Sequence, residues 1–183
     1  MDLPTSWNLD DKPTHLNVDS SGLRVNQDSN QFGAIRANHP IPPQCKLFYF
    51  EVDIIGEVKN ERIVIGLCEK SYNLNNTNGL GCDDRSWGYF GYNGTVWYSS
   101  NSRTYGPSFS TGDTIGCCLN FKNNTVFFTK NGINLGIAIR NLKGTLYPCV
   151  GLHSKVEATI EVNFGSRKFK YEATTSNDMA NLH

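Results

Sequence analysis

The sequence lacks any long apolar segment. Of its 183 residues 38% are hydrophobic, yet no uninterrupted apolar segment comes near the roughly 20 residues that a membrane-spanning helix needs. The first residues, Met1-Asp2-Leu3-Pro4, contain neither the basic nor the apolar part of a signal peptide. We therefore expect a protein that binds no membrane and works in the cytoplasm or the nucleus. Secretion is expected only if a signal peptide has been trimmed away.

Charge of one sign is not in excess either. Lysine and arginine together number 17 and are balanced by 17 acidic residues, so the formal net charge is zero. Nucleic acids attract proteins largely through positive charge, so the composition gives no reason to expect a nucleic-acid partner. The hydrophobic fraction is high enough for one core, and a chain of this length is expected to form one domain. We expect that domain to be a monomer.

The sequence also lacks the short motifs of common catalytic and metal sites. Its four histidines never form a close pair, and it has no nucleophile elbow, P-loop or H-E-x-x-H motif. Asp83 and Asp84 are able to help hold a cation or to act as general acid and base, but Asx turns before a strand are the better interpretation. His153 beside Ser154 is half of a catalytic dyad, and solvated loop residues are again favoured. We therefore expect no enzyme, no cofactor and no metal.

The six cysteines form no C-x-x-C pair. Cys68, Cys117, Cys118 and Cys149 lie among apolar neighbours in segments predicted as strands, so we expect buried free thiols. A disulfide framework is the alternative, and it is not favoured in a chain of this size without a secretory signal.

Residues 112–138 contain three apolar-rich segments and predict an antiparallel β-meander. Asn131-Gly132 suits a two-residue type I′ turn, because both central positions of that turn need a positive φ. The turn at residues 122–124 separates the first two strands. Alternation supports the prediction, since one face of each strand is apolar. Those faces carry Ile115, Cys117 and Leu119 on the first strand and Val126 and Phe128 on the second.

No helical period persists for more than one or two turns. Further strands are expected at residues 15–18, 23–26, 34–37, 46–55, 62–68, 86–90, 95–98, 146–152 and 158–164. Short strands with turn signals at such spacing predict an all-β fold, a sandwich of antiparallel sheets. Residues 1–14 are expected as a lead-in that Trp7 ties to the domain. We expect the domain to span residues 15–173 and residues 174–183 to form a disordered tail.

Two long polar loops carry the functional signal. Residues 69–85 are rich in asparagine and glycine, and residues 99–107 form a second loop without apolar alternation. Recognition sites usually lie on such loops when a stiff scaffold holds them, and tyrosine and asparagine supply contact area and adaptable hydrogen bonds. The loops therefore predict a protein or peptide partner. A glycan stacked on Trp97, Tyr98 or Tyr105 is the alternative, although strand aromatics of this kind are more often core residues.

Several short motifs occur in an order that is typical of one family. They are Phe48-Tyr49-Phe50-Glu51-Val52, Ile65-Gly66-Leu67, Ser86-Trp87-Gly88-Tyr89, Tyr105-Gly106-Pro107, Phe128-Thr129-Lys130-Asn131-Gly132 and Leu146-Tyr147-Pro148-Cys149. Through these motifs the chain resembles a SPRY domain from about residue 3 to residue 169. Within that family it is most similar to the group of Ran-binding protein M and its fungal relatives. Leu3-Pro4-Thr5-Ser6-Trp7 and Ile35-Arg36-Ala37-Asn38-His39-Pro40 carry that closer resemblance.

The resemblance implies a fold and a function. It implies a bent β-sandwich of two antiparallel sheets without catalysis, which binds short linear peptides or partner surfaces through loops at one end. It also implies an adaptor or scaffold role in a ubiquitin ligase of the CTLH (glucose-induced-degradation) type. A standalone SPRY effector that acts on host proteins is an alternative.

The resemblance also implies a binding site. In SPRY proteins with a SOCS box a peptide pocket lies at positions that match residues 25–27, 76–80 and 153–155 of this chain. We expect Tyr72, Leu74, Leu80 and Leu152 to bury an apolar anchor of the peptide, while main-chain and asparagine amides hold its backbone. The full expected set is Val25, Asn26, Gln27, Arg36, Tyr72, Leu74, Asn76, Leu80, Tyr98, Leu152, His153, Ser154 and Lys155.

Overall fold

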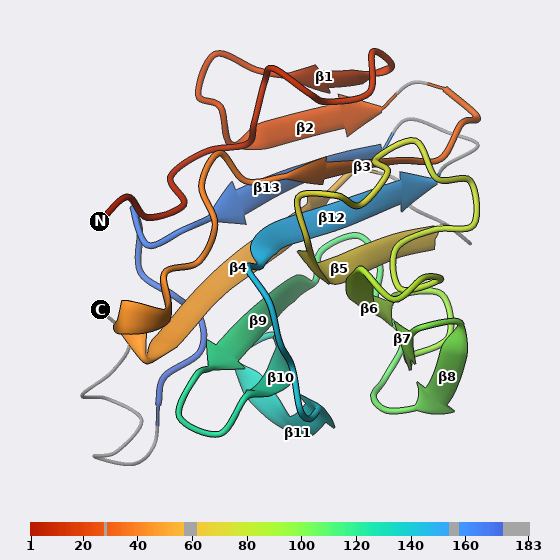
Figure 1. The fold of residues 1–183 in the computed structure, drawn as a ribbon. Helices are drawn as coiled ribbons and strands as arrows, with labels where there is room; N and C mark the ends of the chain where they lie inside the picture. Colours follow the sequence, from red (N-terminus) through yellow and green to blue (C-terminus); the bar gives the residue numbers. More distant parts are fainter. Residues whose placement is uncertain (28, 57–61, 154–157, 174–183) are drawn as a thin grey trace.

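The computed structural model describes residues 1–27, 29–56, 62–153 and 158–173, and for Arg62 and His153 the backbone alone. The chain forms two antiparallel β-sheets that pack face to face (Figure 1), as the sequence predicts. Within the described ranges, no helix has the length and apolar character that crossing a membrane requires.

The larger sheet has seven strands in the order β1-β2-β13-β4-β9-β10-β11. Strands far apart in the sequence therefore become neighbours, because β13 lies between β2 and β4. The strands are β1 (Leu16–Val18), β2 (Arg24–Gln27), β4 (Leu47–Ile55), β9 (Thr114–Asn120), β10 (Thr125–Lys130), β11 (Ile133–Ile139) and β13 (Ala158–Asn163).

The smaller sheet has six strands in the order β3-β12-β5-β6-β7-β8. Its strands β12 and β5 are antiparallel and pair along the whole of both strands. The strands are β3 (Gly33–Arg36), β5 (Arg62–Cys68), β6 (Ser86–Phe90), β7 (Thr95–Tyr98), β8 (Asn101–Thr104) and β12 (Tyr147–His153).

The predicted meander is confirmed as β9, β10 and β11. Asn131 and Gly132 have φ values of 50° and 85°, as a type I′ turn requires.

One prediction is wrong, because the loop expected at residues 99–107 contains β8. All four of its side chains are exposed, so no apolar alternation marks the strand. Pro43–Cys45, between β3 and β4, form a short 3₁₀ helix, η1.

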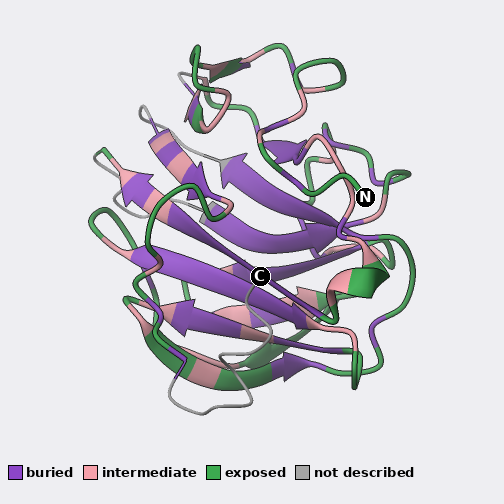
Figure 2. Cartoon of the chain, turned by 90° about the vertical axis from the view of Figure 1, so that its left-hand side faces the viewer, coloured by how far each residue is buried: buried purple, intermediate pink, exposed green. Residues whose placement is uncertain are grey.

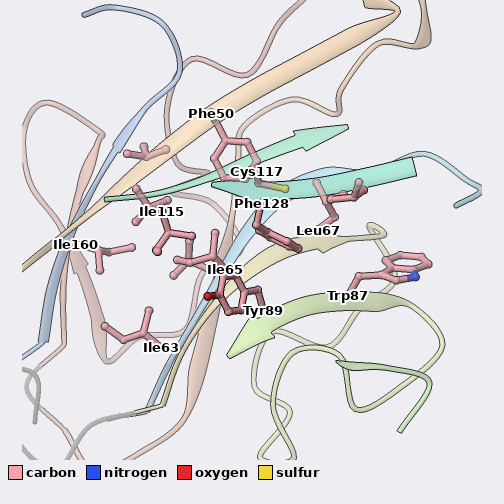
Figure 3. Packing of buried hydrophobic residues seen from close by; sticks show 14 of the residues in the cluster. Phe50, Ile63, Ile65, Leu67, Trp87, Tyr89, Ile115, Cys117, Phe128 and Ile160 are labelled. Carbon is pink, nitrogen blue, oxygen red and sulfur yellow. The ribbon is translucent and has the colours of Figure 1, made fainter. Parts of the chain in front are cut away.

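The main core lies between the two sheets. Side chains of β4, β9 and β10 on one sheet pack against side chains of β5 and β6 on the other (Figure 3). Buried residues follow most of the strands, whereas β8, most of β11 and many of the connections are exposed (Figure 2). The four cysteines that were expected to be buried free thiols are confirmed as such. The residues labelled in the close view are Phe50, Ile63, Ile65, Leu67, Trp87, Tyr89, Ile115, Cys117, Phe128 and Ile160.

Both ends of the described chain pack onto the sandwich. Trp7 is 1% exposed, its indole N–H donates to the carbonyl of Leu23 at 2.9 Å, and its backbone forms a bridge with Ala37. The predicted docking of Trp7 is therefore confirmed. At the other end, Tyr171 and Phe169 pack in an irregular segment against Tyr49 on the outer face of the larger sheet.

Candidate functional site

A polar hollow lies where the β2–β3 connection meets the long loop at residues 69–85. The hollow has a volume of about 330 Å³, and we call it the amide-rich hollow. Phe32 is the apolar member of its lining and is 7% exposed. The remaining lining residues are uncharged. The lining consists of Asn30, Gln31, Phe32, Asn75 and Thr77.

The long loop is ordered by its own asparagines. The Asn73 side-chain oxygen accepts the backbone N–H of Asn75 at 3.0 Å, and the Asn76 oxygen accepts that of Asn78 at 3.0 Å. These Asx turns replace the backbone pairing that a strand would provide. The backbone N–H of Ala34 also donates to the Leu74 carbonyl at 2.9 Å, which ties the loop to β3. The asparagine-rich composition therefore gives the loop a defined shape.

Apolar side chains of the same loop cover the outer face of the smaller sheet. Tyr72, Leu74 and Leu80 are 3%, 6% and 0% exposed and belong to a second apolar cluster. Phe32 belongs to this cluster as well, so the floor of the amide-rich hollow is the edge of a packed layer. The other members of the cluster are Ala34, Val64, Cys68, Tyr147 and Cys149, with Phe90 packed against them.

Five of the residues expected to bind the ligand are thus occupied by the domain itself. Val25 and Leu152 are fully buried in the main core, and Tyr72, Leu74 and Leu80 lie in the second cluster. In this arrangement their side chains do not open onto a surface. Their packing positions the loops.

Arg36 is also removed from the hollow. It is 5% exposed, donates to the Lys70 carbonyl at 2.8 Å, forms an ion pair with Asp11 and lies over the ring of Tyr147. A buried arginine with all these partners ties the N-terminal lead-in to the sheet. A role in ligand contact is therefore not supported by its surroundings.

Asn26 and Gln27 support the β2–β3 connection. The Asn26 amide donates to the Thr159 hydroxyl at 3.0 Å. Gln27 is fully buried, and its amide nitrogen donates to the carbonyls of Ser29 and Gln31. Gln27 therefore shapes the wall that Gln31 contributes to the hollow. Asn76, half-buried, stands beside two lining residues.

Tyr98 lies apart from the hollow, on the β7 side of the smaller sheet. Its ring stacks on Trp87 with centroids 5.3 Å apart, and it is 45% exposed.

The aromatic residues of the glycan alternative are engaged in the fold. Trp97 donates to the Thr95 hydroxyl at 2.9 Å, and the Tyr105 hydroxyl donates to the Gly136 carbonyl at 2.6 Å.

The remaining expected site residues are only partly visible. The backbone of His153 ends β12, while Ser154 and Lys155 lie outside the described residues. The role of these three residues stays a prediction.

Sequence reasoning missed Phe32 as the floor of the hollow. A single aromatic residue inside a polar connection was a usable signal, since the same pattern revealed Trp7.

Asp83 of the long loop acts as a turn residue. The Asp83 carboxylate accepts the backbone N–H of Arg85 at 3.0 Å and the Ser86 hydroxyl at 2.9 Å, which confirms the Asx turn. Across the described residues, no group of three or more histidine, cysteine or acidic side chains is arranged to hold a metal ion.

Burial raises the pKa of the Tyr72 hydroxyl well above its usual value. Among the described residues this hydroxyl has no hydrogen-bond partner. Because the folded-state pKa lies above the unfolded one, Tyr72 contributes to stability below about pH 10 and loses that contribution as the pH rises further.

We therefore expect the Tyr72→Phe variant to be less sensitive to alkaline pH than the unmodified chain. Between roughly pH 10 and pH 11, the free energy of unfolding of the unmodified chain should fall by about 1 kcal/mol more than that of the variant. Urea unfolding of both chains across this range measures the effect. Parallel curves for the two chains above pH 10 would contradict it, and between about pH 7 and pH 9 the curves should run parallel.

Comparison with known proteins shows the family of this chain. A SPRY domain profile matches residues 47–167. The chain is 43% identical over 176 residues to the Ran-binding proteins 9/10 homolog of Drosophila melanogaster, covering 93% of this chain and 18% of the relative. It is 31% identical over 149 residues to the Ran-binding protein M homolog of Arabidopsis thaliana, covering 81% of this chain and 31% of the relative. This chain thus spans less than a third of either curated relative.

A crystal structure of a human SPRY domain has the same fold. The TM-score is 0.72 at 26% sequence identity, and the match covers 85% of this chain and 98% of the human domain. The predicted sandwich and the predicted similarity to the group of Ran-binding protein M are both confirmed. The profile match spans most of the chain, so this chain belongs to the SPRY domain family.

Proposed function

We propose that this domain is a non-catalytic interaction module that binds a short linear peptide at the amide-rich hollow. Membership of the SPRY family supports the general part of this proposal, a protein-interaction module. The observation that carries the specific part is the convergence of Asn30, Gln31, Asn75 and Thr77 around Phe32.

The chemistry of the hollow suits a peptide backbone. Asparagine and glutamine side chains each offer donors and an acceptor, so they can pair with both the N–H and the C=O groups of an extended segment. Phe32 offers an apolar contact for one ligand side chain. Because Asx turns already order the loop around Asn75, little conformational entropy is lost on binding. None of the described residues that line the hollow is charged, so shape and hydrogen bonding would set its specificity.

For the whole protein we propose an adaptor or scaffold role in the cytoplasm, in a ubiquitin ligase of the CTLH type. The similarity to Ran-binding protein M supports this proposal, although the chain spans only 31% of that relative. A standalone SPRY effector is the alternative. Reconstitution with purified ligase subunits separates the two, because an effector would not enter the complex.

The binding proposal is tested by the double variant Gln31→Ala/Asn75→Ala. We expect its affinity for peptides selected on an array with the unmodified chain to fall about tenfold or more, since each lost hydrogen bond contributes on the order of 1 kcal/mol. Fluorescence polarisation measures the affinity. Asn134→Ala is the matched control, because Asn134 is exposed on β11, at the opposite edge of the larger sheet from β1 and β2.

Asn76→Ala and His153→Ala/Lys155→Ala extend the test to the neighbouring loops. Either variant should weaken binding if the site reaches these positions. Normal binding by all the loop variants, together with loss of binding only in core variants, would refute the assignment of the surface.

A further inference from the structure

A second hollow lies at the opposite end of β12 from the amide-rich hollow. It has a volume of about 400 Å³, within the range of ligand pockets, and its apolar lining comes from the end of β9 and from three connections. The connections are the segment before β4, the β9–β10 turn and the β11–β12 connection. The apolar residues are Pro43, Leu119, Phe121, Leu142 and Leu146.

Backbone hydrogen bonds join these three connections into one surface. The N–H of Phe121 donates to the Lys46 carbonyl at 2.8 Å, and the N–H of Leu142 donates to the Asn124 carbonyl at 3.0 Å. The Leu146 carbonyl accepts the N–H of Ile41 at 2.8 Å. The residues next to the hollow are thus held on a fixed frame.

Four cations belong to the three connections that form this hollow. Lys143 is part of its lining, Lys122 and Arg140 stand within two positions of lining residues, and the backbone carbonyl of Lys46 accepts the N–H of the lining residue Phe121. All four are exposed, and within the described ranges none of them forms an ion pair. We call this surface the basic hollow.

Acidic residues are scarce around the basic hollow. The sequence has no aspartate or glutamate between Asp113 and Glu157, a stretch that supplies two of the three connections. The carboxylate of Glu69 comes near, because its Oε1 lies 2.9 Å from the place that a Cβ on Gly144 would occupy. The chain as a whole is neutral, so this is a local excess of positive charge and not a general property.

The backbone of Lys46 adds an independent observation. Lys46 has φ 59° and ψ −39°, a conformation that side chains other than glycine seldom adopt. Strained residues of this kind are found preferentially at functional sites. A glycine would fit this backbone better, so the fold alone does not account for the lysine.

We propose that the basic hollow is a second docking surface, which binds an acidic segment of a partner protein that inserts one large apolar side chain between the cations. Charge complementarity selects the occupant, because carboxylates flanking an apolar residue would meet the four cations. β12 has seven residues and spans roughly 20 Å at about 3.3 Å per residue. Both hollows can therefore be occupied at once.

Phage display of random dodecapeptides on the unmodified chain tests this proposal. We expect one class of enriched peptides to carry aspartate or glutamate on both sides of a large apolar residue. Synthetic peptides of this class should bind Lys143→Glu about tenfold or more weakly, and raised salt should weaken them further. Lys168→Glu is the matched control, because Lys168 is 85% exposed on the C-terminal segment. Its affinity should not change.

Lys46→Gly separates a binding role from a structural one. It removes backbone strain, so the free energy of unfolding should not fall, while affinity for the acidic peptides should. Enriched peptides without acidic residues, or acidic peptides that bind Lys143→Glu normally, would overturn the proposal. A dimer of the unmodified chain that Lys143→Glu dissociates in sedimentation would also overturn it, by assigning the surface to self-association. The Gln31→Ala/Asn75→Ala variant should retain this peptide class, so the two sites fail or succeed independently.

Discussion

Replacing Gly66 with alanine is expected to cost at least about 4 kcal/mol of stability, among the largest effects of a single substitution. Gly66 lies in β5 directly opposite Gly88 of β6. A Cβ at Gly66 would overlap the carbonyl oxygen of Trp87 and lie 2.8 Å from its carbonyl carbon and 2.9 Å from the Gly88 Cα. These are backbone atoms, so no side-chain rotation can relieve the overlap.

The two strands cannot easily move apart. β5 is paired with β12 on its other side, and β6 is paired with β7. The whole smaller sheet would have to adjust, and its inner face is part of the main core. Thermal and urea unfolding, followed by circular dichroism, measure the loss where soluble protein is obtained.

Gly136→Ala is the matched control for this prediction. Gly136 has φ +90°, and a methyl group added to it would have nothing within 4 Å, so only backbone strain of about 1–2 kcal/mol is expected. A Gly66→Ala variant as stable as Gly136→Ala would contradict the close approach of β5 and β6.

The second large effect is expected for Glu51→Gln, which should cost about 3 kcal/mol. The Glu51 carboxylate is 3% exposed and accepts three hydrogen bonds. Its oxygens accept the Tyr49 hydroxyl at 2.8 Å and the backbone N–H groups of Tyr171 at 3.0 Å and Lys170 at 3.1 Å. A glutamine side chain has one acceptor oxygen, whereas the carboxylate has two. Its amide N–H₂ group is a donor, and it would face one of the donors that a carboxylate oxygen accepts in the unmodified chain.

Glu51→Gln should lower the stability of one segment in particular, as well as that of the whole domain. Glu51 holds the segment at residues 169–171 on the outer face of β4, so amide hydrogen exchange at Lys170 and Tyr171 should accelerate more than in the main core. The same substitution at Glu161 is the control. Its ion pair with Arg24, at 3.4 Å, is partly exposed and should contribute less than about 1 kcal/mol. Equal losses for the two variants would refute the role assigned to Glu51.

The sequence by itself determined most of the secondary structure. Each strand of the meander has its own apolar face, and Asn131-Gly132 permits only a few turn types, so local chemistry was sufficient. Strand β8 was not predicted because its side chains are all exposed. Pairing with β7 stabilises this strand, and that pairing leaves no pattern in the residues of β8 itself. Trp7 was found because a large aromatic side chain in a polar segment needs a place to pack.

Only the tertiary structure decided which loop residues are available for binding. Tyr72, Leu74 and Leu80 look like contact residues in a polar loop, but the outer face of the smaller sheet is itself apolar, and they cover it. The path of the loop across that face depends on the packing of β3, β5 and β12, which no local pattern encodes. For the same reason Gln31 and Asn75 meet in one hollow, because the order of strands in a sheet brings together residues that are distant in the chain.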